Sequence, residues 1–305
     1  MKAFEKNARV IFTGDSITAA TRYTARIVDY YRKHLPDLNV KFFQGAEAGG
    51  TVGSAIRFFN KNVLPFKPTH ATVCFGVNDS RRGLLEKDRT EERDAQLREG
   101  FERYKANLNT YLDMLIENGI TPILITPVPY AEYMKIDSPA FLGGHKLIYE
   151  YAEAMKKIAN ERGLELIDLF GEFAKIYEKE ELFISDRIHP NDLGQYRMAE
   201  LILKAQGLEP DPYIPLEEFL KEDYIAEWRK TAYRFCRIYG AFTCVFGGIF
   251  DKSYEEQIEV INEFVLEHKY GNNGVQLDFS TELAVLLPME KALINKLIEL
   301  SEVNN

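Results

Sequence analysis

Short apolar runs alternate with amphipathic helical stretches up to residue 205, and this alternation constrains the fold more than any other feature of the chain. The strand-like apolar runs are residues 8–13, 39–44, 70–75, 120–126 and 164–169. The predicted helices are residues 23–34, 53–60, 101–118, 146–162 and 192–205. Strands that alternate with helices in this way predict a parallel sheet covered by helices on both faces.

A proline-dense segment, residues 209–215, ends this pattern. Proline cannot continue the preceding helix, so the segment is typical of a linker. From Asp211 onward the chain carries 17 acidic against 9 basic side chains, and nearly all of its net charge of -9 therefore lies beyond the segment. We predict a first domain over residues 1–208 and an acidic extension over residues 216–305.

The extension is predicted to be mostly helical. Helical periodicity covers residues 216–239, 254–268 and 281–302, and strand-like patterning is confined to residues 241–250. Four apolar residues fall near one face of the first of these helices: Tyr224, Trp228, Phe235 and Ile238. A stripe at this spacing favours packing against a neighbouring element. We expect the extension to act in oligomerisation or as a lid.

Composition excludes several classes of function. The acidic balance disfavours nucleic acid and anionic lipid as partners, because both require a basic surface. Cys74, Cys236 and Cys244 are scattered, which argues against a disulfide framework and against a zinc site. No segment approaches membrane-spanning length, and no signal-peptide pattern is found, so we expect a cytoplasmic protein without membrane insertion.

Ser16 follows the first apolar run almost directly, within Gly14-Asp15-Ser16-Ile17-Thr18. Ligand-binding and catalytic residues of parallel α/β sheets lie mostly at the carboxyl ends of the strands, so Ser16 is a candidate nucleophile. Taken alone, this signal is weak, because a serine or threonine after a strand usually caps the next helix.

Three other predicted strand ends carry polar residues of the kinds that a nucleophilic serine needs. Residues 44–51 are rich in glycine, which lets backbone N–H groups approach a substrate oxygen. Asn78, within Gly76-Val77-Asn78-Asp79, supplies a side-chain amide, and Asp186 stands three residues before His189. Each of these signals alone also fits a turn or a helix cap.

Together, in this order, the four motifs resemble the blocks of the SGNH hydrolases, also called the GDSL family of esterases and lipases. The resemblance covers residues 8–206. The first block has Ile17 for the usual leucine, and the blocks at residues 76–79 and 186–189 match. The second block departs, with Gln44 in place of asparagine and Ala46 in place of the first glycine.

The residue types support the same chemistry. A serine hydroxyl needs a base within hydrogen-bond reach, and His189 is the best candidate. Asp186 could reach Nδ1–H of His189 and stabilise the imidazolium that forms. The predicted oxyanion hole consists of the N–H groups of Ser16 and Gly49 and the side-chain amide of Asn78, which are the positions that serve this role in the family.

The glycine of the predicted oxyanion hole stays open, because Gly45 or Gly50 could take the place of Gly49. Asp15 and Asp79 lie within the motifs, and we expect each of them to brace its loop by hydrogen bonds.

The resemblance implies a flavodoxin-like three-layer α/β/α fold with a five-stranded parallel sheet, plus the helical C-terminal extension. It also implies a serine ester hydrolase that works through an acyl-enzyme on Ser16, without metal or organic cofactor. The first expected substrate is an O-acetylated carbohydrate or another small polar ester, and the next is a short-chain acyl or lysophospholipid ester. A flavodoxin-like ligand-binding protein or an inactive scaffold is the alternative from another class.

Overall fold

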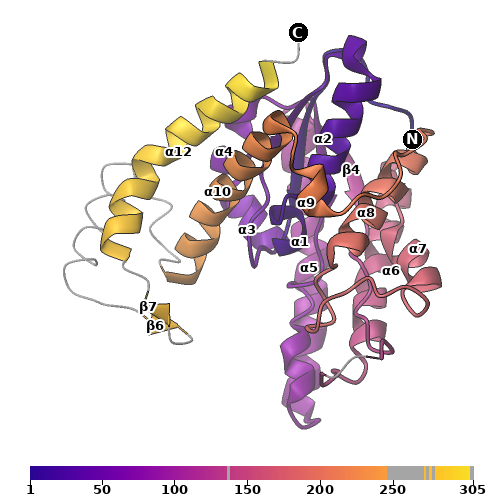
Figure 1. The fold of residues 1–305 in the computed structure, drawn as a ribbon. Coiled ribbons are helices and arrows are strands. Elements are labelled where there is room, and N and C mark those ends of the chain that lie inside the picture. The colour runs from indigo at the N-terminus through magenta and orange to yellow at the C-terminus, as the bar shows by residue number, and fades with distance from the viewer. Residues whose placement is uncertain (136–137, 246–270, 273–274, 277–278, 303–305) are drawn as a thin grey trace.

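A five-stranded, all-parallel sheet forms the centre of the molecule (Figure 1). The computed structural model describes the chain except residues 136–137, 246–270, 273–274, 277–278 and 303–305. The strands are β1 (Arg9–Gly14), β2 (Lys41–Gln44), β3 (His70–Cys74), β4 (Thr121–Ile125) and β5 (Glu165–Ile167). All five predicted strands are present, and the predicted fold class is confirmed.

The strand order is β2-β1-β3-β4-β5, so the direction of chain progression reverses between β1 and β3. These two strands pair in register from Val10 with His70 to Gly14 with Cys74. Val10 and Ile11 are fully buried, as expected for a strand covered on both faces. In such sheets the crevice outside the carboxyl ends of the strands at the reversal point is the usual ligand site.

Helices cover both faces of this sheet. They are α1 (Ser16–Ala19), α2 (Arg22–His34), α3 (Val52–Arg57), α4 (Phe59–Asn62), α5 (Glu91–Glu117), α6 (Gly144–Arg162), α7 (Leu169–Ile176) and α8 (Asp192–Ala205). Short 3-10 turns occupy residues 36–38, 64–66 and 82–86. Helix α2 packs against α8, whereas α5 packs against α3 and α6. Right-handed crossovers place these two groups on opposite faces.

Several helices before residue 209 differ from the sequence prediction, and the short helix α1 was not predicted. The helix expected at residues 53–60 is two short helices, α3 and α4, which meet at Phe58. Helix α5 begins ten residues earlier than expected because Thr90 caps it, accepting a hydrogen bond from the N–H of Arg93 at 3.0 Å. Helix α7 was not predicted, although Asp168 caps it directly after β5.

The chain beyond the proline-dense segment forms α9 (Leu216–Phe219), α10 (Asp223–Val245), a two-stranded hairpin of β6 (Gly271–Asn272) and β7 (Val275–Gln276), and α12 (Phe279–Glu302). The helix predicted over residues 216–239 is therefore split between α9 and α10. The strand-like prediction over residues 241–250 is wrong for 241–245, because α10 continues through Val245. The rest of that segment and the helix predicted at residues 254–268 lie outside the described residues.

Helices α10 and α12 lie side by side (Figure 1). Both pack against β2, the edge strand. Trp228 and Phe235 are fully buried. The indole N–H of Trp228 donates to the carbonyl oxygen of Phe42 at 3.3 Å, and the ring of Phe235 meets that of Phe66 edge-on at 5.5 Å. These residues of the aromatic stripe pack as predicted, and one apolar core includes side chains from both sides of residues 209–215.

No helix in the described part of the chain is long and apolar enough to cross a membrane. The division into a domain over residues 1–208, a linker and an extension stays a prediction.

Candidate active site

Ser16 is the first residue of α1, which begins directly after β1. Gly14 makes this tight transition possible, since a Cβ there would lie 2.3 Å from Oγ1 of Thr18 and 2.8 Å from the carbonyl oxygen of Cys74. Asp15 caps α1 by accepting a hydrogen bond from the N–H of Ile17 at 2.9 Å. The half-buried Ser16 side chain is thereby held at the carboxyl edge of the sheet.

The structure brings Ser16, His189 and Asp186 into one hydrogen-bonded line. Oγ of Ser16 lies 2.8 Å from Nε2 of His189, and Nδ1 of His189 lies 2.5 Å from Oδ2 of Asp186. The other oxygen of Asp186 accepts the backbone N–H groups of Ile188 and His189 at 3.0 and 2.9 Å. This is the geometry of a nucleophile, its general base and the carboxylate that orients the base.

Asp186 is held in its charged form. Its partial burial acts to raise the pKa of the carboxyl, but hydrogen bonds from the backbone and ring of His189 and from Ile188 outweigh burial and lower the pKa below its ordinary value. An ionised Asp186 fixes the proton of neutral His189 on Nδ1 and leaves Nε2 as the acceptor that faces Ser16.

The three candidate glycines differ in whether their backbone N–H already donates a hydrogen bond. The N–H of Gly45 donates to Phe12 at 2.9 Å, and that of Gly50 donates to Glu47 at 3.0 Å. Gly49 is exposed, has a φ of +77°, and donates no backbone hydrogen bond to the described residues. Of the three, Gly49 alone has an amide available to a substrate oxygen.

Asn78 follows β3 and extends its side chain toward the same loop. Its Nδ2 donates one hydrogen bond to the carbonyl oxygen of Gly50 at 3.0 Å. An amide nitrogen carries two hydrogens, so this contact orients the group and leaves the second N–H for a ligand. The N–H of Ser16, in the first turn of α1, has no acceptor within its own helix.

Two buried carboxyls lie behind these donors. Burial raises the pKa of Asp15 to about 6, and burial together with the charge of Asp15 raises that of Asp79 to about 7. Oδ1 of Asp79 accepts the N–H of Val52 at 3.0 Å, which ties the loop after β3 to α3. The hydrogen bonds of the two carboxyls hold the loops on which the donors stand, and the charge of His189 also acts on Asp15.

Arg187 was missed by the sequence analysis. This buried residue lies between Asp186 and Ile188 with a φ of +63°. Its guanidinium donates to the carbonyl oxygens of Ala131, Met134 and Ser138 at 3.0, 2.7 and 2.6 Å. It therefore fastens the loop that carries His189 to the segment that follows β4.

Gln44 and Gln195 support α1 from two sides. Nε2 of Gln44 donates to the carbonyl oxygen of Thr18 at 2.6 Å, and Nε2 of Gln195 approaches that of Ile17 at 3.4 Å. Gln44 is thus a bracing residue at the position where the sequence departs from the family pattern.

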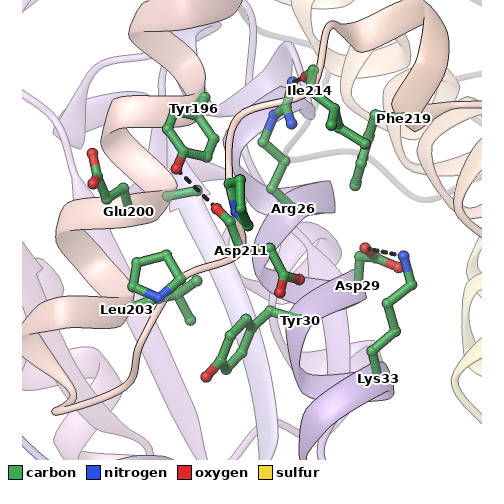
Figure 2. Close-up of a pocket in the computed structure, with 13 residues that line it drawn as sticks. Arg26, Asp29, Tyr30, Lys33, Tyr196, Glu200, Leu203, Asp211, Ile214 and Phe219 are labelled. Carbon is green, nitrogen blue, oxygen red and sulfur yellow. Dashed lines mark hydrogen bonds and ion pairs between the residues drawn. The ribbon is translucent and has the colours of Figure 1, made fainter.

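A cavity of about 320 Å³ lies elsewhere, between α2, α8 and the proline-dense segment (Figure 2). It contains none of the predicted site residues. Tyr196 donates to the carbonyl oxygen of Asp211 at 2.8 Å and Arg26 to that of Ile214 at 2.9 Å, so the segment is fastened to both helices.

Among the described residues, no cluster of three or more histidine, cysteine or acidic side chains is placed to hold a metal ion.

The sequence model of the GDSL-like lipase/acylhydrolase family matches residues 12–197. An acetylxylan esterase from Geobacillus stearothermophilus is 21% identical over 224 residues, which cover 66% of this chain and 94% of the esterase. An isoamyl acetate-hydrolyzing esterase 1 homolog from Rattus norvegicus is 28% identical over 199 residues, which cover 61% of this chain and 76% of the homolog.

Solved structures share the fold. A gut microbial diltiazem-metabolizing enzyme has a TM-score of 0.73 at 18% identity, and the match covers 99% of this chain and 96% of the enzyme. A catalytic mutant of the Geobacillus stearothermophilus acetylxylan esterase has a TM-score of 0.57 at 21% identity, with 70% of this chain and all of the mutant covered. The first of these matches extends through the C-terminal helices as well as the sheet.

Proposed function

The chain belongs to the GDSL-like lipase/acylhydrolase family, and we propose that it removes acetyl groups from O-acetylated carbohydrates or other small polar esters. The hydrogen-bonded line from Ser16 through His189 to Asp186 is the observation that carries this proposal. The names of both curated relatives support acetyl as the acyl group, because one is an acetylxylan esterase and the other hydrolyses isoamyl acetate.

In the first half of the reaction Oγ of Ser16 attacks the ester carbonyl while Nε2 of His189 accepts its proton. The carbonyl oxygen becomes negatively charged and meets the N–H groups of Ser16 and Gly49 and the free N–H of Asn78. One well-placed donor of this kind lowers the barrier by about 3 to 4 kcal/mol. The intermediate then collapses, His189 returns the proton to the leaving alcohol, and the acetyl group remains on Ser16.

In the second half a water molecule attacks the acetyl-enzyme. His189 accepts one proton from this water, the same donors stabilise the second oxyanion, and acetate leaves as the proton returns to Oγ of Ser16. Asp186 keeps its charge throughout and stabilises the imidazolium that forms twice in each cycle.

Labelling by a fluorophosphonate probe tests the nucleophile. We expect the wild-type protein to be labelled and Ser16→Ala to stay unlabelled. Asp186→Asn should remain folded and lose about 10³- to 10⁴-fold in kcat, because neutral His189 then presents the wrong tautomer to Ser16. Labelling of Ser16→Ala to the wild-type level would show that another residue is the nucleophile, and an inert wild type would favour a ligand-binding or scaffold protein.

A panel of esters tests the substrate. Acetylated monosaccharides and 4-nitrophenyl acetate should be hydrolysed with higher kcat/KM than octanoyl esters or a lysophospholipid. A preference for octanoyl chains would replace the deacetylase proposal with the short-chain acyl esterase or lysophospholipase alternative.

Two further proposals concern the compartment in which the protein acts and its self-association. We place the protein in the cytoplasm, which the free, buried thiols of Cys74 and Cys236 support. We also propose that residues 216–305 contribute to self-association, which light scattering of the purified protein would measure.

A further inference from the structure

Arg229, on α10, contacts the carboxyl end of α1. Its Nη2 lies 3.4 Å from the carbonyl oxygen of Ala20. The N–H of Ala20 donates to the carbonyl oxygen of Ser16 at 2.9 Å, so Ala20 stands one helical turn after the proposed nucleophile. Arg22 opens α2 two residues later, and its charge acts on Arg229. Two positively charged residues therefore follow or contact the carboxyl end of the short helix that begins at Ser16.

Both arginines carry a buried nitrogen that is left unpaired. Among the residues that the structure describes, neither Nε of Arg22 nor Nε of Arg229 has a hydrogen-bond partner. Burial and the charge of Arg22 lower the pKa of Arg229, while Tyr233 and Asp192 act in the opposite direction. A partly buried pair of like charges is costly unless an anion accompanies it.

Asp192, an acid whose charge acts on Arg229, has both of its oxygens taken by other groups. Oδ1 accepts from Arg26 at 3.1 Å. Oδ2 accepts from the hydroxyl of Tyr213 at 2.9 Å and from the N–H of Leu216 at 2.8 Å.

The N-terminus of α2 adds to the same positive region. This 13-residue helix has no acidic residue in its first turn, and Thr21 makes no side-chain cap. Unneutralised helix N-termini favour negative charge nearby, and two guanidinium groups provide the planar donors that bind carboxylate and phosphate oxygens.

We propose that Arg22 and Arg229 form an anion subsite beside Ser16 that binds a carboxylate or phosphate carried by the ester substrate. The inference rests on the proposed function and narrows its substrate class to acetylated sugar acids or acetylated sugar phosphates. The four residues from Ser16 to Ala20 advance about 6 Å along a helix, which is the scale of a single sugar ring between the acetyl group and the anionic group.

Matched esters test the subsite. Monoacetylated methyl glucuronide and monoacetylated methyl glucoside differ by a carboxylate in place of a hydroxymethyl group. We expect the wild-type kcat/KM to favour the acidic ester by roughly 10- to 100-fold, as charge-assisted hydrogen bonds would give, and the preference to shrink at high salt. A wild type that prefers the neutral ester, or that shows no preference, would overturn the subsite.

Substitutions of the two arginines test whether they cause the preference for the acidic ester. Arg22→Gln and Arg229→Gln should each reduce the ratio of acidic to neutral turnover, through a higher KM for the acidic ester, and the lysine variants should restore part of it. Arg103→Gln is the matched control, because Arg103 is exposed on α5 and pairs with Glu99. Equal ratios in the wild type and both glutamine variants would contradict the proposal.

Binding to Ser16→Ala separates this inference from the proposed function. Calorimetry with glucuronate and with glucose 6-phosphate reports the subsite without catalysis and distinguishes the two anions. Binding that is lost when Arg22→Gln is added supports the subsite even if no ester is hydrolysed by the wild type. If esters are hydrolysed but neither anion binds, the subsite fails while the hydrolase stands.

Discussion

Asp79 shows how burial governs single side chains around the site. Its ordinary pKa of 3.8 is raised to about 7, first by burial and then by the charge of Asp15. The folded protein therefore holds this proton more tightly than the unfolded chain does. The resulting stabilisation is fully present below pH 3.8 and is lost as the pH rises through about 7.

The prediction at this scale concerns Asp79→Asn, which removes the titration and keeps the shape. Between about pH 5 and pH 8 the free energy of unfolding of the wild type should fall by about 2 to 3 kcal/mol relative to that of the variant, since one pKa unit corresponds to about 1.4 kcal/mol. Urea denaturation at both pH values measures it. Parallel pH profiles for the two proteins would show that Asp79 does not hold a proton in the folded state.

Residue chemistry made part of the site predictable. Ser16, Asn78, Asp186 and His189 were proposed because each stands in a motif at a predicted strand end, and the structure brings Ser16, His189 and Asp186 within hydrogen-bond distance of one another. Only the structure shows which of the amides of Gly45, Gly49 and Gly50 are already bonded.

Other site residues left no such signal. Arg187 acts on carbonyl oxygens about fifty residues away along the chain, so nothing local marks it. The contact of Arg229 with Ala20 depends likewise on where α10 packs.

Secondary-structure elements were predictable where periodicity alone decides them. The five strands were identified because buried parallel strands are continuous apolar runs. The start of α5 was not, since residues 91–100 are mostly polar and exposed and their helix depends on the Thr90 cap. The carboxyl end of α10 was mistaken for a strand because its apolar and aromatic residues have high β-propensity, which a long helix overrides.

The contact of α10 with β2 gives the prediction at the scale of elements. Trp228 is fully buried against this strand, so Trp228→Ala should lower the free energy of unfolding by about 3 to 5 kcal/mol. Trp228→Phe, which keeps most of the packing and loses the indole donor, should cost less. Denaturant titrations measure both.

Leu142→Ala is the control for this experiment. Leu142 is 82% exposed, and its truncation should change stability by no more than about 0.5 kcal/mol. Equal effects of the Trp228 and Leu142 substitutions would mean that α10 is not held on the sheet.

At the scale of the whole molecule, the C-terminal helices cover a sheet edge. An open edge strand invites pairing with other chains, and α10 and α12 close that edge at β2. Phe42 and Phe66 are buried beneath α10. The side chain of Trp228 contacts the backbone of Phe42, and the ring of Phe235 contacts the ring of Phe66.

A chain that ends at Pro210 should therefore be destabilised and should aggregate nonspecifically, which light scattering distinguishes from the defined self-association proposed for residues 216–305. Each newly exposed large apolar side chain costs about 1.5 to 3 kcal/mol, and several of them approach the total stability of a domain. Size-exclusion chromatography and thermal unfolding measure the result. Coexpression of residues 211–305 as a separate chain should restore the monodisperse protein, whereas a truncated protein with an unchanged melting temperature would mean that residues 1–208 are an autonomous unit.

The hydrogen bond between Ser16 and His189 joins residues 173 positions apart. On a ribosome the serine emerges early and meets no base until the last strand-end loop has been synthesised and has docked. On the proposed mechanism, a chain released before His189 is made carries a serine hydroxyl of ordinary reactivity and does not attack esters. The proposed catalytic competence is then a late event of biosynthesis, set by the separation of Ser16 and His189 along the chain.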